Sequence, residues 1–156
     1  MPENIVIRNN VFRDNPVAAA VNGLGASAAV AIYPGTKYPT NARLMRHFRI
    51  EGNIIINPSI YGIVVRNAED VVIRNNRIIN PGACAVTGIF QGRPISEQYA
   101  AICLDAVSRA EVTDNEIVFG NPRCQRAILM ETNCDAGTIR LERNHEFHGE
   151  TGSTEN

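Results

Sequence analysis

The sequence has no tryptophan, few other aromatic residues and no long apolar run, and these shortages exclude whole classes of protein. Its 156 residues include only four tyrosines and five phenylalanines. No apolar stretch approaches the ~20 residues that a membrane-spanning helix needs. The start, MPENIVIRNN, lacks the charged and apolar segments of a signal peptide. We therefore expect no membrane partner, and the compartment stays open between an intracellular protein and a mature or excised piece.

An excess of one charge is also missing, and the cysteines do not cluster. The 15 lysines and arginines nearly balance 16 aspartates and glutamates. No basic block could neutralise a phosphate backbone, so we expect no nucleic-acid partner. Cys84, Cys103, Cys124 and Cys134 form no CxxC pair, so we expect no metal site and no cofactor. Disulfides between Cys84 and Cys103, and between Cys124 and Cys134, are two open hypotheses.

The sequence does contain a repeated phrase of alternating apolar residues followed by asparagine. Five segments align on Asn10, Asn53, Asn76, Asn115 and Asn144. The residues five and three places before each asparagine are apolar, a period of two that is typical of a half-buried strand. A second apolar strand follows each Asn-Pro, at 29–32, 62–65, 101–104 and 127–130. Each repeat is therefore expected to supply three short strands.

The spacing of the repeats predicts an architecture. Asn53 and Asn76 are 23 residues apart, about one turn of a solenoid whose coils each add a strand to parallel sheets. We therefore expect an all-β parallel β-helix of about five coils with three parallel sheets. Residues 1–148 would form this single domain, with insertions at 17–28, 34–46 and 83–99 and a polar tail at 149–156. The asparagines should stack as ladders between coils.

The repeated phrases IVIRNN, VVIRNN and EVTDN resemble those of the right-handed β-helix superfamily of pectate lyases and related glycoside hydrolases, over residues 5–147. The resemblance implies right-handed coiling. Enzymes of that superfamily usually have more coils, so we expect a homo-oligomer or missing neighbouring coils. The phrase RHFRIEGN, after AVAIYPG, is similar to α-galactosidase β-helices of glycoside hydrolase family 110. No catalytic motif of that family has a counterpart here.

Stacked coils would place one polar row directly after the second strands. If alternate residues of those strands fill the core, this row faces outward. An aromatic ring, a cation and two carboxylates suit a poly- or oligosaccharide site. We predict Asp105 and Glu131 as acid/base carboxylates, with Arg66 and Tyr33 as substrate contacts. The insertions should wall a groove with further contacts, namely Tyr38, Arg43, Phe90, Arg93 and Glu97.

The carboxylate spacing leaves the reaction open. Adjacent coils would place Asp105 and Glu131 near the ~5 Å of retaining glycosidases, whereas the family resemblance implies inversion and ~6.5 to 9.5 Å. One carboxylate would then need another partner, such as Glu97. The plain alternative is that Arg66 and Asp105 form a surface ion pair without a catalytic role. An apolar row beside them also needs a cover, and consists of Ala31, Val64, Cys103 and Leu129.

Three functions compete on these grounds. The first is a glycoside-hydrolase-type module that binds and cleaves a glycan in a groove on one parallel sheet. The second is a non-catalytic glycan-binding module, or a structural module that oligomerises. A polysaccharide lyase comes third, because this face has too few clustered aspartates to hold calcium well.

Overall fold

The computed structural model describes residues 3–15, 28–32, 45–90 and 92–149, and its regular structure is almost entirely strand. The strands are β1 (Glu3–Arg8), β2 (Val11–Asn15), β3 (Ala28–Ile32), β4 (Met45–Glu51), β5 (Ile54–Pro58), β6 (Tyr61–Arg74), β7 (Arg77–Ile79), β8 (Ile89–Phe90), β9 (Arg93–Pro94), β10 (Ala100–Thr113), β11 (Glu116–Phe119), β12 (Ile128–Met130), β13 (Ile139–Glu142) and β14 (His145–His148). Within the described ranges the helical segments are two short 3-10 turns, η2 (Ile95–Glu97) and η3 (Ala136–Thr138). Neither turn is long enough to cross a bilayer.

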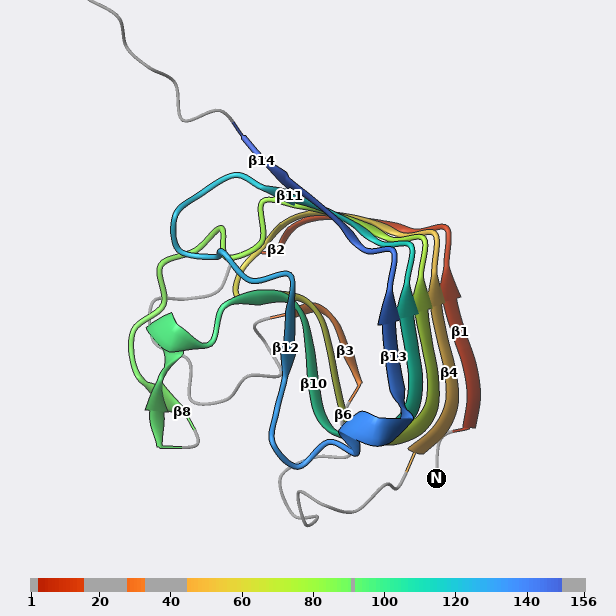
Figure 1. The fold of residues 1–156 in the computed structure, drawn as a ribbon. Helices are drawn as coiled ribbons and strands as arrows, with labels where there is room; N and C mark the ends of the chain where they lie inside the picture. Colours follow the sequence, from red (N-terminus) through yellow and green to blue (C-terminus); the bar gives the residue numbers. More distant parts are fainter. Residues whose placement is uncertain (1–2, 16–27, 33–44, 91, 150–156) are drawn as a thin grey trace, which may run out of the picture.

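The strands form two parallel sheets and one short antiparallel pair. The larger sheet has seven strands in the order β1-β4-β6-β10-β12, with β3 beside β6 and β13 beside β10. The smaller has five strands in the order β14-β11-β7-β5-β2, and β8 pairs with β9. Figure 1 shows equivalent strands of successive repeats stacked one behind another, from red β1 to blue β13. Residues far apart in sequence therefore become neighbours at a strand spacing of about 4.8 Å.

The prediction of a right-handed parallel β-helix with about five coils and three parallel sheets is wrong. The described strands make two parallel sheets, and they do not close into a solenoid. Segments 62–65 and 71–73, predicted as separate strands, belong to the single strand β6. Segments 101–104 and 110–112 are likewise parts of β10. Two of the three expected sheets are therefore one.

Residues with left-handed backbone let β6 and β10 turn a corner without ending. Asn67 in β6 and Ala106 in β10 have φ of 54° and 53°, and Asp70 and Arg109 have φ of 56° and 48°. Because equivalent residues of β6 and β10 bend together, the parallel pairing runs through the bend from Ala100 opposite Tyr61 to Thr113 opposite Arg74. The polar phrases NAED and AVSR look like connections in the sequence but are paired strand in the structure.

The inward residues of the two sheets share one core. Phe48, Ile50 and Ile73 of the larger sheet, and Ile55 and Ile78 of the smaller, are at most 1% exposed. Burying each such side chain stabilises the fold by roughly 1.5–3 kcal/mol. The alternation of apolar residues that predicts these strands is therefore the alternation that fills the core.

The expected asparagine ladder is confirmed. The backbone and side-chain amides of Asn53 donate to Asn76 Oδ1 at 3.0 and 2.9 Å. Asn76 donates in the same way to Asn115 Oδ1, at 3.0 Å for both bonds. The Asn76 side chain also donates to the Ile50 carbonyl at 2.8 Å. Asn10 and Asn144 continue the ladder at its two ends.

A second ladder runs along the Asn-Pro phrases, which in the sequence indicate only the boundaries between strands. Asn57 Nδ2 donates to Asp14 Oδ1 at 2.7 Å, and Asn80 Nδ2 donates to Asn57 Oδ1 at 2.8 Å. Asn121 Nδ2 donates to Asn80 Oδ1 at 2.7 Å. Strands β5, β7 and β11 therefore have one asparagine ladder at their starts and another at their ends.

We expect Asn76→Ala to lower the free energy of unfolding by about 2–4 kcal/mol, because the buried Asn53 amides and Ile50 carbonyl lose their partner. Urea denaturation followed by circular dichroism measures this loss. Asn10→Ala is the matched control, since its exposed carboxamide only donates, to Arg8 and Asn53. It should cost less than about 1 kcal/mol. Equal losses for both variants would contradict a buried ladder that holds the repeats together.

Candidate functional site

The structure brings together three of the four residues of the predicted polar row. Arg66 lies opposite Asp105 in the pairing of β6 with β10, and Arg66 Nε is 3.6 Å from Asp105 Oδ2. Glu131 directly follows β12, and its N–H donates to the Leu104 carbonyl at 2.9 Å. The adjacency of these three residues is therefore as predicted. Outside the described residues lie Tyr33, Tyr38 and Arg43.

The 83–99 insertion reaches this row through an ion pair. Arg93 Nη2 of β9 lies 2.5 Å from Glu131 Oε1. The side chains of Asp105, Arg66 and Glu131 are only 4%, 13% and 14% exposed. The predicted surface row is thus largely buried, and its two carboxylates belong to two ion pairs, of which only Arg93 on the insertion is well exposed, at 40%.

The insertion is itself well anchored. The Tyr99 hydroxyl accepts a hydrogen bond from the Val86 N–H and donates one to the Cys84 carbonyl, both at 2.9 Å. Ile95 is buried in the common core. Of the other predicted contacts, Glu97 is exposed and lines a hollow with Arg123 and Arg126. The backbone of Phe90 in β8 pairs with that of Arg93 in β9.

The expected cover of the neighbouring apolar row is present over its middle, whereas Ala31 and Leu129 at its two ends are half-buried. Val64 and Cys103 are 1% and 0% exposed. Burial raises the pKa of the Cys103 thiol to about 12, and burial also raises the pKa of the Tyr61 hydroxyl. All four cysteines are free, so neither disulfide hypothesis holds in this structure. Cys103 is an inert core residue at neutral pH.

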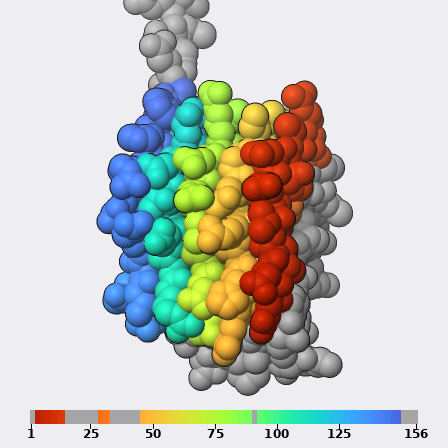
Figure 2. Space-filling model, turned by 90° about the vertical axis from the view of Figure 1, so that its right-hand side faces the viewer, coloured from red at the N-terminus to blue at the C-terminus, as the bar shows by residue number. Residues whose placement is uncertain are grey.

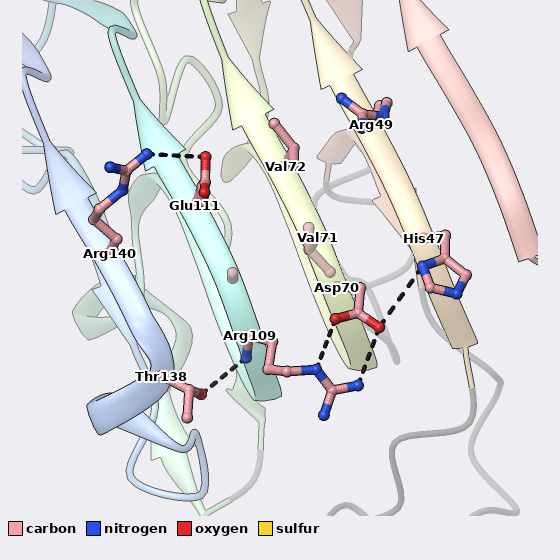
Figure 3. Close-up of a pocket in the computed structure, with 10 residues that line it drawn as sticks. His47, Arg49, Asp70, Val71, Val72, Arg109, Glu111, Thr138 and Arg140 are labelled. Carbon is pink, nitrogen blue, oxygen red and sulfur yellow. Dashed lines mark hydrogen bonds and ion pairs between the residues drawn. The ribbon is translucent and has the colours of Figure 1, made fainter.

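An exposed groove of about 580 Å³ lies elsewhere, on the outer face of the larger sheet. Figure 2 shows this face, with the strands as bands from red β1 to blue β13. The groove crosses β4, β6, β10 and β13, and Figure 3 shows its side chains projecting from these neighbouring strands. Its polar lining consists of His47, Arg49, Asp70, Arg109, Glu111, Thr138 and Arg140.

Hydrogen bonds order one end of the groove. Arg109 holds Asp70 with two bonds, Nε to Oδ1 at 2.7 Å and Nη2 to Oδ2 at 3.0 Å. His47 Nδ1 lies 3.6 Å from the same carboxylate, and the Thr138 hydroxyl accepts from the Arg109 N–H at 2.8 Å. The hydrogen bonds from Arg109 hold the pKa of the Asp70 carboxyl below its usual value. Asp70 is therefore an ionised acceptor at neutral and mildly acidic pH.

Two further ion pairs lie at the other end of the groove. Arg140 Nη2 lies 3.0 Å from Glu111 Oε2, and Arg49 Nη1 lies 3.4 Å from Glu51 Oε1. Val72 stands between Arg49 and Glu111 in one row across the strands. At this end, the donor Arg49 lies on one side of the apolar Val72 and the acceptor Glu111 lies on the other.

This groove is not among the sequence predictions. Its one signal in the sequence is a polar residue at the same position of three repeats, and that signal does not give the direction of the side chains. His47, Asp70 and Arg109 occupy equivalent positions, directly before the apolar residues Phe48, Val71 and Ala110. Their left-handed φ values are 60°, 56° and 48°. A non-glycine residue rarely adopts this conformation, so their shared projection from the sheet is visible only in the structure.

We expect Asp105→Asn to destabilise the fold by about 3 kcal/mol, because it leaves the Arg66 guanidinium buried without its carboxylate. Replacing the pair together, as Arg66→Met with Asp105→Leu, should recover most of that loss, since apolar residues of similar volume often substitute for a buried ion pair. Thermal and urea unfolding measure both effects. A single variant as stable as the wild type would show that the pair does not hold the structure.

No family model, curated protein or solved structure matches this chain. The resemblances to the pectate-lyase-like superfamily and to glycoside hydrolase family 110 therefore stay predictions. Any assignment of function rests on the geometry of the two sites just described.

Proposed function

We propose that this chain is a non-catalytic module that binds an oligosaccharide in the groove on the outer face of the larger sheet. The observation that carries the proposal is the arrangement of Arg49, Glu111 and Arg140 around the apolar floor at Val72. A few placed polar groups over an apolar surface are typical of ligand sites. Sugar hydroxyls both donate and accept hydrogen bonds, and the ring C–H groups suit an apolar floor.

The rigidity of the sheet supports binding at this position. The groove residues stand on paired strands whose register is locked by the asparagine ladder. Arg109 is further fixed by its two bonds to Asp70 and by Thr138. Side chains that are ordered before the ligand arrives lose little conformational entropy on binding, which favours affinity.

The burial of the predicted carboxylates supports binding over cleavage. A glycosidase needs two carboxyl groups that reach the scissile bond, one of them protonated. Asp105 is 4% exposed beside Arg66, and Glu131 is paired with Arg93. In the groove itself, the lowered pKa of Asp70 makes that residue a poor general acid.

We expect Arg49→Ala and Glu111→Ala each to weaken oligosaccharide binding at least tenfold, equivalent to about 1.4 kcal/mol, the loss of a hydrogen bond to a charged group. A glycan array identifies the ligand, and titration calorimetry measures its affinity. Arg77→Ala is the matched control, since Arg77 is ion-paired and 54% exposed on the other sheet, against 55% for Arg49.

Two results would contradict the proposal. The first is the absence of glycan binding, or binding that the two groove variants leave unchanged. The second is turnover of a chromogenic glycoside that Asp105→Asn or Glu131→Gln abolishes in a protein with an intact circular dichroism spectrum. That second result would place hydrolysis at the covered row.

A further inference from the structure

We infer that the groove takes an uncharged oligosaccharide that lies across the strands, and this inference rests on the proposed function. Its first support is the alternation of charge between neighbouring strands. One row across the sheet reads Val6, Arg49, Val72, Glu111 and Arg140. The next polar row reads Arg8, Glu51, Arg74, Thr113 and Glu142. Both rows carry both signs, so neither of them offers an acidic polymer a stripe of positive charge alone.

The groove arginines are already neutralised by protein carboxylates. Arg109 contacts Asp70 and Glu69, at 2.7 and 3.0 Å. Arg140 contacts Glu111 and Glu142, at 3.0 and 3.6 Å. With the contact of Arg49 to Glu51, each groove arginine has at least one carboxylate partner. Three of these carboxylates are shared with a further arginine, namely Glu69 with Arg46, Glu51 with Arg74 and Glu142 with Arg143.

An acidic sugar would therefore have to compete with a carboxylate at each arginine, and it would also face the charges of Asp70 and Glu111. Like charges at close range oppose binding, whereas a hydroxyl can donate to a carboxylate and accept from an arginine at the same place. Interleaved donors and acceptors thus favour a neutral polyhydroxyl ligand over a negatively charged one.

The positions of donor and acceptor set the direction and the length of the ligand. Arg49 stands on β4 and Glu111 on β10, with β6 between them. Two strand spacings separate their backbones by about 10 Å. A ligand that contacts both side chains over Val72 must extend beyond one sugar ring, and it runs from strand to strand. Arg140 on β13 offers a further donor in the same direction.

The experiment compares neutral hexose hexasaccharides, of glucose, mannose and galactose, with a uronic acid hexasaccharide. Titration calorimetry is run on the full chain at 50 mM and at 500 mM NaCl. We expect a neutral hexamer to bind at least tenfold more tightly than the acidic one. Its affinity should change less than about twofold with salt, because screening acts on charged ligands. Glu111→Gln should weaken neutral binding, while Arg77→Gln should leave it unchanged.

Reversing the charge of Glu111 tests directly whether that charge disfavours acidic ligands. Glu111→Lys should reduce the preference for the neutral hexamer over the acidic one, and should make acidic binding weaken as salt increases. Since Glu111 is half exposed on the surface, the fold should survive, and circular dichroism checks this.

The outcomes separate the inference from the proposed function. Tighter, salt-sensitive binding of the acidic hexamer that Arg49→Ala abolishes would overturn the uncharged ligand and leave a glycan site in the groove. Binding of neither hexamer class, or neutral binding that Arg49→Ala and Glu111→Gln both leave unchanged, would overturn the inference and the proposed function together.

Discussion

The stacking of equivalent asparagines is the interaction on which the rest of this structure depends, because it sets the register between repeats. Asn76 accepts both amides of Asn53 and donates both of its own to Asn115. A slip of one residue would break these bonds and would turn every side chain of a strand to the opposite face. The same register places Arg66 opposite Asp105 and Arg49 opposite Val72.

One register thus produces two surfaces of different character. At the ends of the second strands, the row of Arg66, Asp105 and Glu131 is met by Arg93 of the 83–99 insertion and is largely buried. On the outer face of the larger sheet, the rows around Val72 line an open groove. Charged residues hold an insertion in place at the first surface. At the second they are accessible to a ligand.

Regular, local features of the sequence explain what could be predicted. Period-two alternation predicts the strands, and the repeated asparagine predicts the ladder and the adjacency of Arg66, Asp105 and Glu131. The number of sheets could not be predicted, because it depends on left-handed backbone at Ala106 and Arg109. Alanine and arginine rarely adopt a left-handed conformation, so their presence in the sequence does not predict it. The conformation is held in the folded protein because the neighbouring strands bend at the same place.

The sequence by itself determined which residues of different repeats become neighbours, since that follows from spacing and from identical chemistry at each corner. Only the tertiary structure decided which of those rows are covered and which are open. The cover comes from an insertion that has no repeat of its own, and its position depends on long-range contacts such as Arg93 with Glu131 and Ile95 with the core. Burial is a property of such packing, and no local pattern encodes it.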